Sequence, residues 1–160
     1  MADDPILFAV GDGNHSLATA WQCYLDQPSE RTRYALIEVV NLYNESIVFK
    51  PIHRLLVGVE AKELQEAAAR AGVKLDGGDV RQVQPFLDAW LPRTAKLDYI
   101  HGESALTSLA AREGVAGIRL SRIKKETLFP SLHGGQVLPR KSFSIGRAEE
   151  KRYYMECRIM

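Results

Sequence analysis

The strongest constraint on this chain comes from its first 28 residues, where an apolar run meets a glycine-bracketed turn and an amphipathic segment. Residues 6–10 are uniformly apolar, which is typical of a strand covered on both faces. Gly11 and Gly13 flank Asp12, and glycine permits the positive φ angles of a sharp turn. Apolar residues then recur at helical spacing: Leu17, Ala20, Trp21, Tyr24 and Leu25. We expect a strand, a tight turn and a helix that stops before Pro28.

A turn of this kind presents free backbone N–H groups at the start of a helix, where the helix dipole also favours negative charge. The sequence predicts Asn14 as the N-cap. It also predicts a phosphate- or carboxylate-binding turn built from Gly11, Gly13, Asn14 and Ser16. Asp12 and His15 are the candidate catalytic groups beside it. A capped turn without a ligand is the alternative, because glycine and asparagine are ordinary turn residues.

A basic loop near the end of the chain, residues 138–147, is a second candidate for anion recognition. Guanidinium, ammonium and hydroxyl groups are the donors that phosphate and carboxylate need. We expect this loop to meet the first turn at one end of the domain. The anion-binding residues predicted here are Arg140, Lys141 and Ser142, with Arg54 from an earlier segment. A solvated loop neutralised by Glu149 and Glu150 is the alternative.

All four histidines fall in turns or at predicted strand ends: His15, His53, His101 and His133. Ligands of α/β proteins commonly bind at strand ends, so several imidazoles could share a pocket with Asp12 and Glu103. An imidazole titrates near neutral pH, which suits His15 or His53 to acid–base catalysis. No two histidines have the close helical spacing of strong metal motifs, so we assign no metal ligands. The cofactor is unknown, and a divalent metal stays an alternative.

The rest of the chain alternates between strand and helix patterns. We expect a strand at 33–42 that pairs in antiparallel fashion with one at 47–59, interrupted near Pro51. Helices are expected at 61–71, with Gly72 as the stop, and from Asp79 onward, with Pro85 as an alternative start. A strand at 97–101, a helix and a strand at 115–120 suggest a β–α–β crossover. A short helix at 125–132, interrupted at Pro130, and a strand at 152–159 follow. This predicts a single-domain α/β (α+β) fold, a mixed sheet flanked by helices.

Bulk properties narrow the classes of partner. The 160 residues suffice for one domain over residues 1–160, and the formal charge of +1 gives no general attraction to nucleic acid. No apolar run approaches the roughly 20 residues that span a bilayer, so we expect no membrane partner. The two cysteines lack metal or redox spacing, which suggests a reducing cytoplasm. A homodimer is compatible with these features.

Three separated segments carry a resemblance: residues 11–20, 51–55 and 138–142. In this order they resemble segments of a large bacterial family of unknown function, DUF1015. The first is also distantly similar to the phosphate-binding loop of ParB-like and sulfiredoxin-like proteins, some of which bind nucleotides and one branch of which phosphorylates free serine. Ser16 stands where those loops carry arginine. Family members are usually longer before this motif, so the resemblance implies that the chain is the C-terminal part of a longer protein.

Two functions follow from these patterns and from the resemblance. The leading one is binding of a nucleotide or another phosphorylated or anionic small metabolite, with a kinase-like reaction as its analogy-based extension. The alternative is a non-catalytic regulatory or protein-interaction module that has lost ligand binding, of which Ser16 would be a trace.

Overall fold

The computed structural model describes residues 6–11 and 13–146, and the chain divides into two compact units, Met1–Asn44 and Glu45–Met160. The strand predicted at residues 6–10 is wrong, because these residues have no regular secondary structure and expose Leu7, Phe8 and Val10. A strand needs a neighbouring backbone to satisfy its N–H and C=O groups. Among the described residues, every strand pairing lies beyond residue 48. Residues 6–10 have no such partner among the described residues, so this apolar run forms no strand and stays largely exposed.

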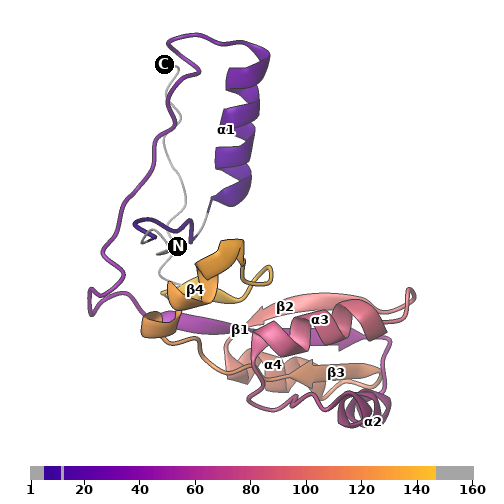
Figure 1. The fold of residues 1–160 in the computed structure, drawn as a ribbon. Coiled ribbons are helices and arrows are strands. Elements are labelled where there is room, and N and C mark those ends of the chain that lie inside the picture. Colours follow the sequence, from indigo (N-terminus) through magenta and orange to yellow (C-terminus); the bar gives the residue numbers. More distant parts are fainter. Residues whose placement is uncertain (1–5, 12, 147–160) are drawn as a thin grey trace. The chain divides into compact units, whose positions relative to one another are not determined.

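The helix after the turn is α1 (Asn14–Asp26), which ends before Pro28 as predicted (Figure 1). The cap differs from the prediction. Gly13 occupies the N-cap with a φ of 84°, and Asn14 is already the first helical residue. The amide of Leu17 donates to the carbonyl of Gly13 at 3.0 Å, and no side chain caps the helix. No residue of α1 is buried, so its apolar stripe has no cover among the described residues.

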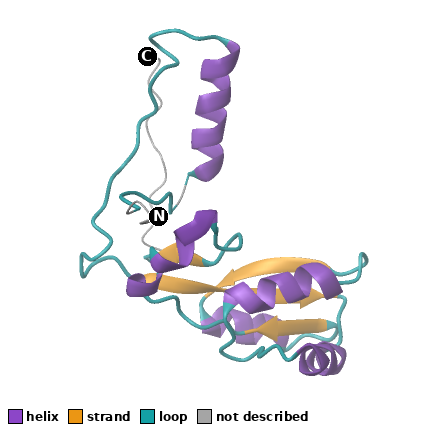
Figure 2. Cartoon of the chain, in the orientation of Figure 1, coloured by secondary structure: helices purple, strands orange, loops and turns teal. Residues whose placement is uncertain are grey.

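Residues 33–42, also predicted as a strand, belong to the loop that connects α1 to the second unit (Figure 2). Strand-forming side chains are present, yet Tyr34, Leu36 and Val39 are all exposed. The predicted antiparallel pairing with residues 47–59 is therefore wrong. Strand propensity describes how well a residue fits a half-buried pleated surface, and here no such surface is supplied.

The second unit is built around β1 (Phe49–Val57), which pairs with β2 (Lys96–His101), β3 (Val115–Ile118) and β4 (Phe143–Ile145). The order is β2-β1-β3, with β4 on the first residues of β1. Ile52 lies opposite His101, Arg54 opposite Ile118, and Pro51 opposite Phe143. Pro51 thus precedes the β2 pairing, which begins at Ile52, so its missing N–H costs that ladder nothing.

The connection between β2 and β3 is a crossover, as predicted. Both strands run antiparallel to β1 and hence parallel to each other, and α4 (Glu103–Ala110) joins them. β1 lies between them, so the crossover is split (Figure 1). The α+β class is confirmed. Every pairing between these four strands is antiparallel, and the parallel component that we expected is confined to an isolated bridge between Gly78 and Leu120.

Two helices confirm the sequence signals at their ends. α2 (Ala61–Ala71) stops at Gly72, which has a φ of 66°. α3 (Val80–Trp90) begins after Asp79, whose carboxylate accepts a hydrogen bond from the amide of Arg81 at 2.9 Å. The helix therefore starts at its cap and continues through Pro85. In place of one helix at 125–132 there are two 3₁₀ turns, η1 (Lys125–Thr127) and η2 (Pro130–Gly135). The strand predicted at 152–159 lies outside the described residues.

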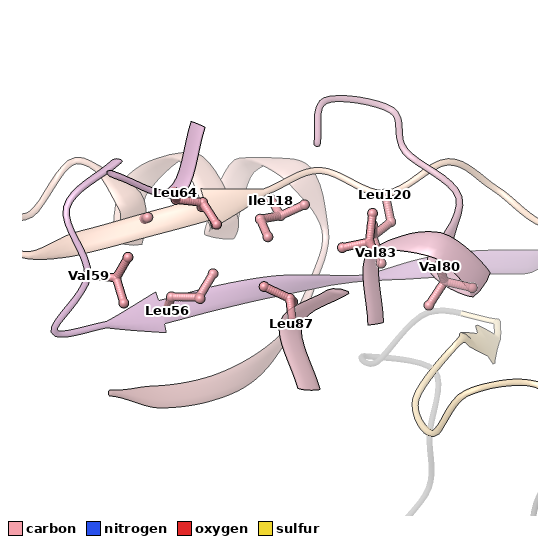
Figure 3. Close-up of a cluster of buried hydrophobic side chains, with 9 residues drawn as sticks. Leu56, Val59, Leu64, Val80, Val83, Leu87, Ile118 and Leu120 are labelled. Carbon is pink, nitrogen blue, oxygen red and sulfur yellow. The ribbon is translucent and has the colours of Figure 1, made fainter. Parts of the chain in front are cut away.

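The core of the second unit lies between the sheet and α2 and α3. Side chains from β1, the turn after it, both helices and β3 point toward one another in Figure 3. Its buried members are Leu56, Val59, Leu64, Val80, Val83, Leu87, Ala116, Ile118 and Leu120. Alternation along the strands places the intervening residues on the opposite face. There α4 approaches closely, because Gly117 has no side chain: a Cβ would lie 2.9 Å from that of Ala110.

Candidate anion-binding site

A cavity of about 610 Å³ opens where β2 and β3 end and α4 begins. We call it the histidine pocket. Its ionisable lining residues within the described chain are Lys50, His53, His101, Glu103, Arg119 and Arg122. Three cations thus face one carboxylate, with two imidazoles beside them. Two of the four histidines and Glu103 share this pocket, as the strand-end argument predicts. The described lining thus carries an excess of positive charge, and a lining of one dominant sign focuses the local potential.

His53 is the most constrained of these groups. It is 1% exposed, and its Nδ1 accepts a hydrogen bond from the backbone amide of Leu120 at 3.1 Å. A nitrogen that accepts carries no proton, so neutral His53 holds its proton on Nε2. Burial lowers the pKa of His53, against the opposing effect of Glu103. His53 is therefore a neutral hydrogen-bond donor. Of the two roles in acid–base catalysis, only that of proton donor is then open to His53. Its Nε2 carries a proton and has no lone pair that could accept one.

Glu103 is the first residue of α4, and its carboxylate faces the guanidinium of Arg119. Arg119 donates to both oxygens of Asp76, from Nε at 2.7 Å and from Nη2 at 2.9 Å. Its Nη1 lies 3.6 Å from the Glu103 carboxylate, too far for a good hydrogen bond. The bond from Arg119 lowers the pKa of Asp76. Asp76 thus fixes the guanidinium, while the Nη1 edge stays open to a better acceptor than Glu103.

The backbone adds donors at the same place. Gly102 is the N-cap of α4, has no side chain to offer and lines the pocket. The first intrahelical bond runs from the amide of Leu106 to the carbonyl of Gly102, at 3.2 Å. The amides of residues 103–105 precede this bond and so have no acceptor within the helix. With the cations around them, they suit an oxyanion.

Sequence reasoning missed Lys50, Arg119 and Arg122. Each is a single cation in ordinary surroundings, with no motif around it. Lys50 comes from the start of β1, whereas the two arginines follow β3, and only the antiparallel pairing of these strands brings them to one cavity. The available signal was the position of Arg119 at the end of the strand predicted at 115–120 and of Arg122 just after it, since ligands gather at such ends.

Arg54, predicted to bind an anion, is placed by the structure among acceptors of the protein itself. It is completely buried and donates to Gln84 Oε1 at 2.8 Å and to the backbone carbonyls of Ile52, Arg140 and Lys141 at 2.7–3.1 Å. Burial lowers its pKa to about 10, so it stays charged at neutral pH. Its guanidinium also lies 4.7 Å from the centre of the Tyr99 ring. These contacts tie the 138–146 loop to the sheet.

The predicted basic loop thus meets the sheet through its backbone. Arg140 and Lys141 expose their side chains, and neither lines the histidine pocket. The hydroxyl of Ser142 donates to the carbonyl of Pro139, which occupies it within the loop. Ser144 and Gly146, farther along, do line the pocket. The loop contributes to the site at a position later than the one that we predicted.

The residues predicted around the first turn belong to the other unit. Gly11, Asn14, His15 and Ser16 are exposed, and Asp12 lies outside the described residues. Their anion-binding and catalytic roles stay predictions. Within the described part of the chain, no group of three or more histidine, cysteine, aspartate or glutamate residues is arranged to hold a metal ion. No helix there is both long and apolar enough to cross a bilayer.

Comparison with known proteins gives one result. The model of the family described as protein of unknown function, DUF1015, matches residues 2–154. The chain belongs to this family. The DUF1015 match includes both the first turn and every residue that lines the histidine pocket. No curated protein and no solved structure matches the chain.

Proposed function

We propose that this DUF1015 protein binds a small phosphorylated or similarly anionic metabolite in the histidine pocket. The observation that carries the proposal is the convergence of three cationic side chains, a neutral imidazole donor and the start of α4 at Gly102 and Glu103 on one cavity of about 610 Å³. This volume lies within the usual range of small-molecule sites. Charge-assisted hydrogen bonds from guanidinium and ammonium groups are the strong, directional contacts that phosphate recognition uses.

Each group has a distinct part in this proposal. Lys50 and Arg122 are exposed at the rim and supply charge without a fixed partner among the described residues. Arg119 is held by Asp76 and offers Nη1. His53 donates through Nε2 from the pocket wall. Among the described lining residues Glu103 is the one carboxylate, and it suits a ligand whose hydroxyl or ammonium group can donate to it.

Nucleotides belong to this ligand class, and a kinase-like reaction on them is the extension that the ParB-like resemblance suggests. The catalytic roles predicted for Asp12 and His15 belong to the first turn, which lies in the other unit. The histidine pocket itself supports binding and positioning: its neutral imidazole and fixed arginine stabilise negative charge, and neither is placed to remove a proton.

Isothermal titration with inorganic phosphate, glycerol phosphate and ATP tests the proposal. Arg122→Ala and Lys50→Ala should each weaken binding about tenfold, because a hydrogen bond to a charged group contributes about 1.5–3 kcal/mol. Arg112→Ala and Lys62→Ala are matched controls on exposed positions outside the pocket, and they should bind like the wild type. Binding should also weaken with added salt.

If no member of this panel binds, the proposal is wrong and the regulatory or interaction module becomes the better reading. If a ligand binds with equal affinity to all four variants, the anion site lies elsewhere in the chain, and the first turn is then the place to examine by substitution of His15.

A further inference from the structure

A second hollow, of about 840 Å³, runs along the outer edge of β3 between α2 and α4. We call it the alanine groove. It is an edge groove because β3 is the last strand in the order β2-β1-β3. Its lining is mainly aliphatic and includes Leu64, Ala68, Ala69, Leu106, Ala110 and Ala116, with Gln65 and Thr107 as uncharged polar members. No aromatic side chain of the described residues lines it.

The alanine groove and the histidine pocket meet at one ion pair. Glu103 and Arg119 line both hollows, and the distance between Arg119 Nη1 and the Glu103 carboxylate is 3.6 Å. Both side chains are about half exposed or more, and a pair so wide and so solvated contributes little stability. An incoming anion can therefore take the place of Glu103 at Nη1, while Asp76 keeps the guanidinium in position.

We propose that the ligand of the histidine pocket is an organic phosphate with an aliphatic body, whose head group lies at Arg119 and whose hydrocarbon part lies in the alanine groove. This inference rests on the proposed function. Continuity through the shared arginine and the change from cationic to aliphatic lining both argue for one amphipathic ligand. A nucleobase fits less well, because no aromatic side chain of the described residues lines the groove to stack on it.

Isothermal titration with ethyl, butyl, hexyl and octyl phosphate, each below its micelle concentration, tests the proposal. Affinity should rise roughly fourfold for each methylene that enters the groove. Ala69→Trp fills the groove from an exposed position on α2, and it should abolish the gain with chain length while ethyl phosphate binds as before. Ala89→Trp, exposed near the end of α3 and outside the groove, is the matched control and should keep the gain.

The outcomes separate this inference from the function on which it rests. Arg122→Ala should weaken every member of the series by the same factor. If ethyl phosphate binds but longer chains gain nothing, the aliphatic-body inference is wrong and the anion site stands. A gain that survives Ala69→Trp also overturns the inference, since the chain then binds elsewhere. If neither short nor long phosphates bind, the proposed function fails first.

Discussion

His53 and Arg54 are neighbours in β1 whose side chains take opposite faces of the sheet. Arg54 reaches Gln84 of α3 on the core face, and His53 lines the pocket beside α4. Both are fully buried ionisable groups, but they differ in charge state. Arg54 keeps its charge because several carbonyls accept from it, whereas His53 stays neutral and pairs with an amide. Partner chemistry, more than depth, decides the charge state of a buried group.

The lowered pKa of His53 makes a prediction for stability against pH. An unfolded histidine titrates near its ordinary value of 6.5, and burial lowers the pKa of His53 in the folded protein. Between those two values the unfolded chain binds more protons, so stability falls as the pH drops below about 6.5. His53→Gln keeps a donor near Nε2 and cannot titrate. Urea unfolding from pH 7.5 to 5 should show a smaller loss of stability in this variant than in the wild type.

The difference between wild type and His53→Gln removes the contributions of the other titrating groups, because both proteins contain them. Those that act on His53 are Glu103, Arg119, Arg54 and His101, and none is altered by the substitution. Parallel pH profiles for wild type and variant would show that His53 is not held neutral by the fold.

At the scale of elements, the site depends on a short parallel contact between residues 76–78 and the segment after β3. The amide of Gly77 donates to the carbonyl of Arg119 at 2.8 Å, and the amide of Ser121 donates to the carbonyl of Gly78 at 2.9 Å. These bonds hold the segment that carries Arg119 and Arg122 to the pocket. Gly78 permits the tight turn that presents residues 76–78 to this segment, because a Cβ there would lie 1.9 Å from the carbonyl oxygen of Lys74.

Gly78→Ala should therefore destabilise the protein by about 3 kcal/mol or more, since the clash is with backbone that cannot rotate away. Gly72→Ala is the control: nothing lies within 4 Å of a Cβ placed there, and only its left-handed conformation, with a φ of 66°, opposes the change. That strain costs about 1–2 kcal/mol. Urea unfolding of the two variants measures the difference. Equal losses would mean that the 76–78 contact does not need glycine.

At the scale of the whole molecule, burial is distributed very unevenly between the two units. The core residues all come from the second unit, and within 6–11 and 13–44 no described residue is buried. Exposed segments without packed side chains open most easily. The first unit thus adds little to the core that positions the histidine pocket.

Limited trypsin digestion should therefore cut first after Arg31 or Arg33, which lie in the exposed loop. The remaining fragment should unfold at the same temperature as the intact chain, as followed by circular dichroism. Lys62 and Arg70 are equally exposed but lie in α2, whose backbone bonds oppose cleavage. Early cuts in α2 would show that the second unit is the weaker one.

Structural features that depend only on neighbouring residues could be predicted from the sequence. The Gly72 stop, the Asp79 cap and the break at Pro130 depend on neighbouring residues alone, and each could be read from the chain. The strands predicted at 97–101 and 115–120 correspond to β2 and β3, because short strand-forming runs between turns become strands when a sheet receives them. Residues 6–10 and 33–42 carry the same pattern and are not strands, since pairing depends on a partner that no local pattern specifies.

The residues of the candidate site, too, could be predicted only in part from the sequence. Alternation and strand ends made His53, His101 and Glu103 candidates for a shared pocket, but the sequence could not say that Arg54 would be enclosed or that Arg119 and Arg122 would be the nearby cations. Which face of β1 meets α3, and which meets α4, follows from how the core packs. Side-chain type and spacing decide the local turns and helices, whereas only the antiparallel pairing around β1 decides which charges share a cavity, because that pairing joins residues far apart in the chain.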